Sequence, residues 1–224
     1  NQGDNTVWTP SVTNTAGSLE LATNGIVCES YPQVAEAALK EGWEFMGHGW
    51  IQGPSHKVDN QAEAIAKTMD AIRRFAGKAP RGWECPGLTE TDETIDLLSA
   101  AGVDYVADWV IDDQPTWIEG TPRPMLSVPY TVEINDIPLM AIQHHRSDEM
   151  YHRGVLQLER LWQESSVNPK VMAISVHPYI TGVPHRIAGF EKLLDHVLSK
   201  PEVAVMPGVD IADWYTAQVP PKKG

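Results

Sequence analysis

The sequence of 224 residues predicts an α/β fold, specifically a (β/α) barrel that lacks one or more units. Strand-like and helix-like segments alternate along the chain, which is the order of parallel βαβ units. The pattern contains about six or seven strands, and the chain is shorter than the roughly 250 residues of a full eight-unit barrel. The sequence has no GxGxxG, GxxxxGK[ST] or GxSxG motif. Their absence disfavours a nucleotide-binding sheet and a serine hydrolase.

The first half of the chain shows the alternation of predicted strands and helices most clearly. Residues 1–17 are polar and lack helical periodicity, so we expect an irregular N-terminal arm there. The clearest helix covers residues 59–78, where apolar side chains recur every three or four positions and Gly77 ends the pattern. The remaining pattern up to residue 110 predicts strands at 18–25, 43–48, 81–87 and 103–110 and helices at 30–42 and 91–102.

The pattern changes between residues 112 and 148. Alternating apolar residues predict two extended segments, at 124–133 and 137–145, which can pair as a hairpin. The apolar residues of this excursion lie outside the main alternation, so we expect a homo-oligomer. Residues 18–224 are predicted to form one domain. After the excursion the sequence predicts helices at 148–166, 185–200 and 209–218 and strands at 170–180 and 203–208.

The composition and net charge of the chain disfavour nucleic acid and membranes as partners. The formal net charge of -13 disfavours nonspecific binding to nucleic acid or to anionic membranes. No apolar run approaches the roughly 20 residues that cross a bilayer, and no leader pattern begins the sequence. We therefore expect a cytoplasmic protein. Cys28 and Cys85 form no CxxC pair, so we expect buried free thiols rather than a bridge or a zinc finger.

Several predicted strands end in titratable side chains. A single histidine at a strand end is more often a structural hydrogen-bonding residue, but repetition at several strand ends favours a site. In parallel α/β folds, ligands bind beyond the carboxyl ends of the strands. We expect His48 and His177 to face one pocket. The histidines at 56, 152, 185 and 196 lie in predicted loops or helices, where solvent exposure explains them. The strand-end groups are His48, Glu84, Asp108, Asp112, Asp113, His144, His145 and His177.

A family resemblance covers about residues 18–215. The segments EFMGHGW, RGWECPGLTETDET, DYVADWVIDDQP, VPYTVEINDIP, IQHHRSDE and ISVHPYITGVPHR resemble the polysaccharide deacetylase superfamily (carbohydrate esterase family 4, the NodB homology domain). The most similar branch contains allantoinase-like and peptidoglycan-deacetylase-like proteins. The resemblance implies an irregular, incomplete (β/α) barrel and an enzyme that hydrolyses C–N bonds other than peptide bonds. We also expect the enzyme to be bacterial.

The resemblance has two departures, and both concern metal. Metal-dependent members bind zinc or another divalent ion through an early Asp and two histidines four positions apart. Here His48 is followed by Gln52, and glutamine is a poor zinc ligand. The early acidic motif is also missing, and Asp4 is not a convincing substitute. We therefore expect no certain cofactor, with His48 as the zinc ligand only if metal is bound, and a chain that lacks the first strand–helix region of the family.

The resemblance also implies roles for particular residues. His177 matches the general acid, while His48 is a water-orienting base or a lone ligand and Glu84 a base or a substrate anchor. Arg81 matches an arginine that orients an acid. Either Asp108 or Asp113 is expected to pair with Arg81 or to hold His177. The tryptophans beside the strand ends form either an aromatic wall or part of the core. The expected substrate-binding residues are Trp50, Gln52, Arg81, Trp83, Asp113 and His144.

Three functions remain open from the sequence. The first is a metal-independent, allantoinase-like amidohydrolase acting on a small cyclic or linear amide. The second is a metal-dependent N-deacetylase of a glycan such as peptidoglycan or a chitooligosaccharide, with an N-acetyl sugar as substrate. The third is a binding or assembly protein that keeps the fold without catalysis.

Overall fold

A computed structural model describes residues 19–222, which divide into two compact units. The sheet unit holds the described residues up to Pro129 together with those from Met206 onward. The helical unit holds Tyr130–Val205. The predicted arm at 1–17, with Asp4, lies outside the described residues. The prediction of one domain over residues 18–224 stays a prediction.

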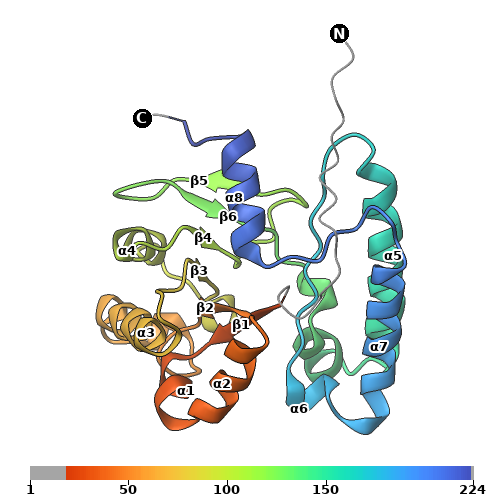
Figure 1. Cartoon of the computed structure of the whole chain (residues 1–224), viewed down its shortest axis with the longest axis horizontal. Coiled ribbons are helices and arrows are strands. Elements are labelled where there is room, and N and C mark those ends of the chain that lie inside the picture. The colour runs from red at the N-terminus through yellow and green to blue at the C-terminus, as the bar shows by residue number, and fades with distance from the viewer. Residues whose placement is uncertain (1–18, 223–224) are drawn as a thin grey trace. The chain divides into compact units, whose positions relative to one another are not determined.

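The sheet unit is built on a six-stranded sheet with the order β1-β2-β3-β4-β6-β5 (Figure 1). All neighbouring strands are parallel except β5 and β6, which are antiparallel. The register pairs Thr23 with Gly47 and Gly47 with Trp83, so the carboxyl ends of the first three strands lie at one edge. The strands are β1 (Glu20–Thr23), β2 (Glu44–Gly47), β3 (Gly82–Trp83), β4 (Tyr105–Val106), β5 (Thr116–Ile118) and β6 (Met125–Ser127).

Helices cover both faces of this sheet. Figure 1 shows α3 and α4 on one side of it and α8 on the other. Trp83, Val106 and Met125 pack among residues of α3 and α4, whereas Tyr105 and Leu126 pack against α8. This is the alternation of a strand with two buried faces. The helices are α1 (Gly25–Ser30), α2 (Pro32–Lys40), η2 (Ser55–Lys57), α3 (Gln61–Ala76), η3 (Pro86–Leu88), α4 (Thr94–Ala101) and α8 (Gly208–Gln218).

The boundaries of α3 follow from its sequence. The side chain of Asn60 accepts a hydrogen bond from the backbone N–H of Glu63, which caps the first turn. Gly77 adopts φ 79° and closes the last turn onto the Arg73 carbonyl. The predicted helix at 59–78 is therefore confirmed, with both ends fixed by local chemistry.

The helical unit is organised by two long helices. A Cβ atom on Gly154 of α5 would lie 2.6 Å from a methyl carbon of Leu193 on α7, so the glycine allows these helices to approach closely. Leu193 is fully buried in the core of this unit. The elements are η4 (Val132–Ile134), the π-helix η5 (Ile137–Ile142), α5 (Glu149–Glu164), α6 (Pro178–Thr181) and α7 (Pro184–Leu198).

Three predicted strands were wrong. Residues 137–145 begin with the π-helix η5, because a short apolar run is ambiguous in period and Pro138 suits a first helical turn. Residues 170–177 contribute a single bridge, from Ser175 to Asn135. Helical turns on both sides of Asn135 leave it no extended neighbours for a longer ladder. Residues 203–207 form no strand in the described chain, despite their β-branched composition.

The predicted fold class is confirmed as a parallel-rich α/β fold of the incomplete (β/α)-barrel kind. Strands form inside the predicted segments 18–25, 43–48, 81–87 and 103–110, and β6 forms inside 124–133. The hairpin partner of β6 is β5, not the segment at 137–145.

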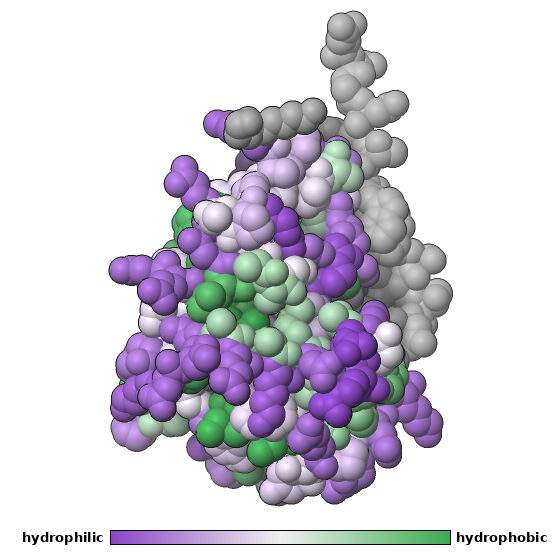
Figure 2. Space-filling model, turned by 90° about the vertical axis from the view of Figure 1, so that its left-hand side faces the viewer, coloured by the Kyte–Doolittle hydropathy of each residue, from purple (hydrophilic) through white to green (hydrophobic). Residues whose placement is uncertain are grey.

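Figure 2 shows one face of the molecule, where hydrophilic side chains surround a group of apolar ones. Within residues 19–222, no helix has both the length and the apolar composition needed to span a bilayer.

Candidate active site

His48 lies directly after β2, as predicted from the end of its strand. Its backbone N–H donates to the Thr23 carbonyl at 3.0 Å, and its own carbonyl accepts from the Asn24 side chain. The residue is 8% exposed, and Nδ1 of its ring lies 2.7 Å from the Glu84 carbonyl oxygen. A carbonyl can only accept, so Nδ1 carries the proton and the lone pair of the neutral ring is on Nε2.

Asp108 fixes the segment that holds His48. The Oδ1 atom of Asp108 accepts a hydrogen bond from the backbone N–H of Cys85 at 2.6 Å. The preceding residue, Glu84, supplies the carbonyl that accepts from His48. Because β2, β3 and β4 are adjacent and parallel, the residues that follow them meet at one edge of the sheet. The structure thus places His48, Glu84 and Asp108 after three neighbouring strands, and a pocket that they share with His177 stays a prediction.

Asp108 is an acid in an unfavourable place for charge. It is 5% exposed, and its Oδ2 atom has no hydrogen-bond partner among residues 19–222. Burial raises the pKa of Asp108 well above its ordinary value, and the nearby carboxyls of Glu90 and Glu84 raise it further. The hydrogen bond from Cys85 opposes this effect without cancelling it. Its surroundings therefore favour the neutral form of Asp108 over the charged form.

In the helical unit, His177 is held by a carboxylate that the sequence analysis missed. Nδ1 of His177 lies 2.7 Å from Oδ1 of Asp136. The backbone N–H of His177 and the hydroxyl of Thr181 both donate to Oδ2 of Asp136, each at 2.7 Å. The candidates Asp108 and Asp113 were wrong in this role. A signal was present, because Asp136 interrupts an apolar stretch and a buried carboxylate needs partners.

The charge on Asp136 is supported by its hydrogen bonds. Its side chain is 0% exposed. Burial by itself raises the pKa of a carboxyl, but hydrogen bonds from His177 and Thr181 outweigh burial and lower the pKa of Asp136 below its ordinary value. An ionised Asp136 accepts from Nδ1–H of His177 and leaves Nε2 as the nitrogen that exchanges protons.

Arg81 pairs with acids other than those predicted. Its Nε donates to Asp104 at 2.6 Å, and its two terminal nitrogens donate to Asp213 at 2.9 and 2.6 Å. The prediction of Asp108 or Asp113 as its partner was therefore wrong. Arg81 precedes β3 and Asp104 precedes β4, so this ion pair forms at the amino ends of the strands. A contact between Arg81 and substrate stays a prediction.

The other predicted binding residues have varied surroundings. Trp83 is 3% exposed and packs against Gly47, which favours a core role. Trp50 lies under the ammonium of Lys67, at 3.6 Å from the ring centroid. Their contacts with substrate stay predictions, as do those of the remaining three. Gln52 and His144 are exposed, and Asp113 is partly buried.

The cysteines are free and buried, as the sequence predicts. Burial raises the pKa of the Cys85 thiol far above its ordinary value, and the Asp108 carboxyl adds to this. A thiolate is the reactive form of cysteine, so the structure disfavours Cys85 as a nucleophile.

The described residues do not fit a zinc site. Within residues 19–222, no group of three or more His, Cys, Asp and Glu side chains has an arrangement that could hold a metal ion. Four positions after His48, the exposed Gln52 supplies an amide, a weak donor beside imidazole or carboxylate.

The sheet unit is a parallel-rich α/β sheet covered by helices, and the helical unit holds His177 against a buried carboxylate. The family model described as polysaccharide deacetylase matches residues 21–106. A "Putative polysaccharide deacetylase" of Schizosaccharomyces pombe is 29% identical over 217 residues, covering 88% of this chain and 68% of the relative. A "Peptidoglycan deacetylase" of Helicobacter pylori is 20% identical over 227 residues, covering 87% and 78%.

The crystal structure of Puue allantoinase has the same fold, with a TM-score of 0.84 and 24% identity over 91% of this chain and 69% of that chain. Over residues 21–106 the chain therefore resembles the polysaccharide deacetylase family, and over most of its length it has the fold of these solved structures. One relative comes from a yeast, so a bacterial origin stays a prediction.

Proposed function

We propose that this protein hydrolyses a small cyclic or linear amide and that His177 transfers the proton in this reaction. The observation that carries the proposal is the bond between His177 and the buried Asp136. Amide hydrolysis adds water to the carbonyl carbon, breaks the C–N bond and delivers a proton to the leaving nitrogen. An imidazole held through Nδ1 presents Nε2 for that delivery, and the carboxylate stabilises the imidazolium.

His48 and Glu84 have proposed roles in the same reaction. The bond from Nδ1 of His48 to the Glu84 carbonyl fixes the orientation of the ring. We assign His48 to orienting the attacking water and the Glu84 carboxylate to anchoring the substrate or acting as the base. That His48 and His177 serve one reaction rests on the sequence pattern.

The preference for a small amide rests on the residues available at the end of β2. Metal-dependent glycan deacetylation requires a set of strong donors, and Gln52 supplies a weak one. Glycan N-deacetylation is the second candidate, because the curated relative from Helicobacter pylori is named a peptidoglycan deacetylase. The two candidates differ in substrate size and in their response to added or removed metal.

A substrate panel tests the proposal. The panel contains cyclic imides, hydantoin-type ureides, linear ureides and N-acetylglucosamine oligomers, each assayed with a chelator and with added zinc. We expect turnover of a cyclic or linear amide that the chelator leaves unchanged and that His177→Gln abolishes. His196→Gln is the matched control, because His196 on α7 also pairs with a carboxylate, Glu159, at 2.9 Å.

Each other outcome has a definite meaning. Turnover of the glycan oligomers alone, lost with the chelator and restored by zinc, would establish the second candidate. Amide turnover that His177→Gln and His196→Gln reduce equally would remove His177 from the chemistry. Absence of turnover across the whole panel would favour a protein that binds without catalysis.

A further inference from the structure

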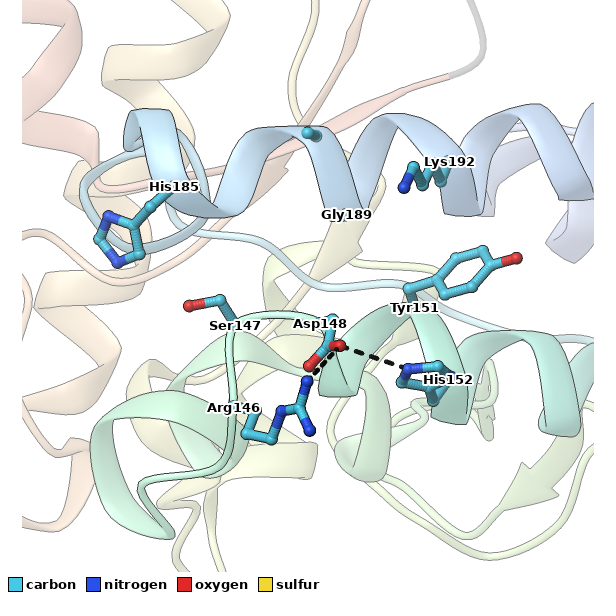
Figure 3. A pocket seen from close by; sticks show the side chains of 9 residues that line it. Arg146, Ser147, Asp148, Tyr151, His152, His185, Gly189 and Lys192 are labelled. Carbon is cyan, nitrogen blue, oxygen red and sulfur yellow. Dashed lines mark hydrogen bonds and ion pairs between the residues drawn. The ribbon is translucent and has the colours of Figure 1, made fainter.

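A hollow of about 690 Å³ lies between α5 and α7 in the helical unit (Figure 3). Neither the sequence pattern nor the proposed chemistry gives it a role. Its walls come from the loop before α5, the first turn of α5 and one face of α7. We name it the α5–α7 pocket.

The face of α7 explains both the hollow and its charge. Three residues of the pocket lining follow His185 at distances of three, four and seven positions, so all four lie on one face of the helix. They are Ala188, Gly189 and Lys192. The two small residues leave room in the middle, and a potential cation stands at each end. A Cβ atom on Gly189 would meet only the carbonyl oxygen of Ser147, at 3.5 Å, and the Asp148 backbone.

The acid in this pocket is already paired. Oδ2 of Asp148 lies 3.1 Å from Arg146 and 3.5 Å from His152, and Figure 3 shows both side chains turned toward it. Burial by itself raises the pKa of Asp148, but its backbone hydrogen bond and these two partners lower it, so the carboxylate stays charged. Lys192 and His185 have no ion pair within residues 19–222.

The local charge therefore opposes that of the whole chain. Formal net charge is -13 overall, whereas the pocket lining has Arg146 and Lys192 against a single carboxylate, with two histidines that add charge when protonated. A concave positive site in an acidic protein attracts anions selectively. Tyr151, from the first turn of α5, adds an aromatic ring and a hydroxyl to the wall.

We propose that the α5–α7 pocket binds a small organic anion, with its carboxylate between Lys192 and His185 and its organic part against Tyr151. The carboxylate accepts from the ammonium of Lys192 and from a ring N–H of His185. The aromatic wall favours a ligand with an apolar or planar part over an inorganic ion. The site is independent of the proposed hydrolysis, and either can fail without the other.

Titration of the whole chain with sodium benzoate, followed by amide NMR signals at constant ionic strength, tests this proposal. We expect saturable shifts at Gly189 and Tyr151 and weaker binding of acetate, which lacks the ring. Sodium chloride is the reference for ionic strength. Equal shifts with chloride, or equal affinity for inorganic phosphate and benzoate, would overturn the proposal.

Variants connect the signal to the pocket. Lys192→Gln removes one charge-assisted hydrogen bond and should weaken benzoate binding by about tenfold. Lys78→Gln, an exposed lysine of the sheet unit, is the control for overall charge and should leave the affinity unchanged. Gly189→Leu fills the hollow and should abolish the shifts. Benzoate binding that survives both Lys192→Gln and Gly189→Leu would place the ligand elsewhere.

Discussion

The imidazole of His177 and the carboxylate of Asp136 form a pair that is fixed at both ends. Nδ1 of His177 lies 2.7 Å from Oδ1 of Asp136, and the backbone N–H of the same histidine donates to Oδ2 at 2.7 Å. The carboxylate thus holds the ring and the chain segment that carries it. Thr181 adds its hydroxyl, so three donors compensate the burial of one charge.

Replacing Asp136 by Asn is expected to lower kcat by about a hundredfold or more, with little change in KM, because the neutral amide neither fixes the tautomer nor stabilises the imidazolium. Steady-state kinetics on the substrate found by the panel will measure this. Thr181→Val is the comparison, since it removes one hydrogen bond to Asp136 and keeps the bond to the ring. A proportional rise in KM with unchanged kcat would contradict proton transfer by His177.

The hydrogen bond from the Cys85 N–H to Asp108 gives a prediction about stability. Asp108→Asn keeps an acceptor for the Cys85 N–H without a charge, so its free energy of unfolding should stay within about 1 kcal/mol of the parent protein. Asp108→Leu keeps the branching of the side chain but is bulkier and leaves that N–H unpaired, and it should cost at least about 1–3 kcal/mol. Urea unfolding at neutral pH measures both. Equal losses in the two variants would show that the bond to the Cys85 N–H is not what Asp108 contributes to stability.

Much of the sheet could be predicted because its signals are local. The helix at 59–78 has a regular apolar period and a glycine at its end, and the strands before it and after it end at turns or polar residues. The region after residue 130 was harder. Its apolar runs at 137–142 and 170–176 fit either a strand or a helix, and the choice depends on which neighbour is extended.

The candidate site shows the same limit. His48 and His177 could be chosen from their positions after apolar segments. Asp136 is marked in the sequence only as an acid within an apolar stretch. Its pairing with His177 could not be predicted, because the two residues lie 41 positions apart and only the folded chain joins them. One partner of Arg81 is further still, since Asp213 is 132 residues away. Long-range pairs between charged residues carry no periodic signal, so sequence reasoning chose among the acids at a predicted strand end.

A buried carboxyl at the start of β2 predicts a pH-dependent stability. Burial raises the pKa of Glu44 to about 8, from an ordinary 4.5, and the charge of Glu20 adds to the effect. A raised pKa means that the folded state holds the proton more tightly than the unfolded state. Its stabilising contribution is therefore complete below pH 4.5 and is lost as the pH rises toward about 8.

Glu44→Gln mimics the protonated side chain and should remove this dependence. Between the two pKa values, the free energy of unfolding of the parent protein should fall relative to the variant by up to about 1.4 kcal/mol per pH unit. Urea unfolding of both proteins across this range, compared at each pH, isolates the contribution of Glu44 from that of other groups. Parallel pH profiles for the two proteins would show that Glu44 titrates normally.

Two glycines in the paired helices predict opposite responses to the same substitution. In a helix interior, Gly→Ala is favourable by about 1 kcal/mol in the absence of contacts. At Gly154 the added Cβ would lie 2.6 Å from Leu193, which is fully buried, so Gly154→Ala should lower the free energy of unfolding by about 1–3 kcal/mol. At Gly189 the nearest atom is at 3.5 Å, an ordinary contact, so Gly189→Ala should be neutral or stabilising. Thermal and urea unfolding of the two variants will compare them directly. If Gly154→Ala is as stable as Gly189→Ala, then α5 and α7 do not approach as closely as the Gly154–Leu193 contact requires.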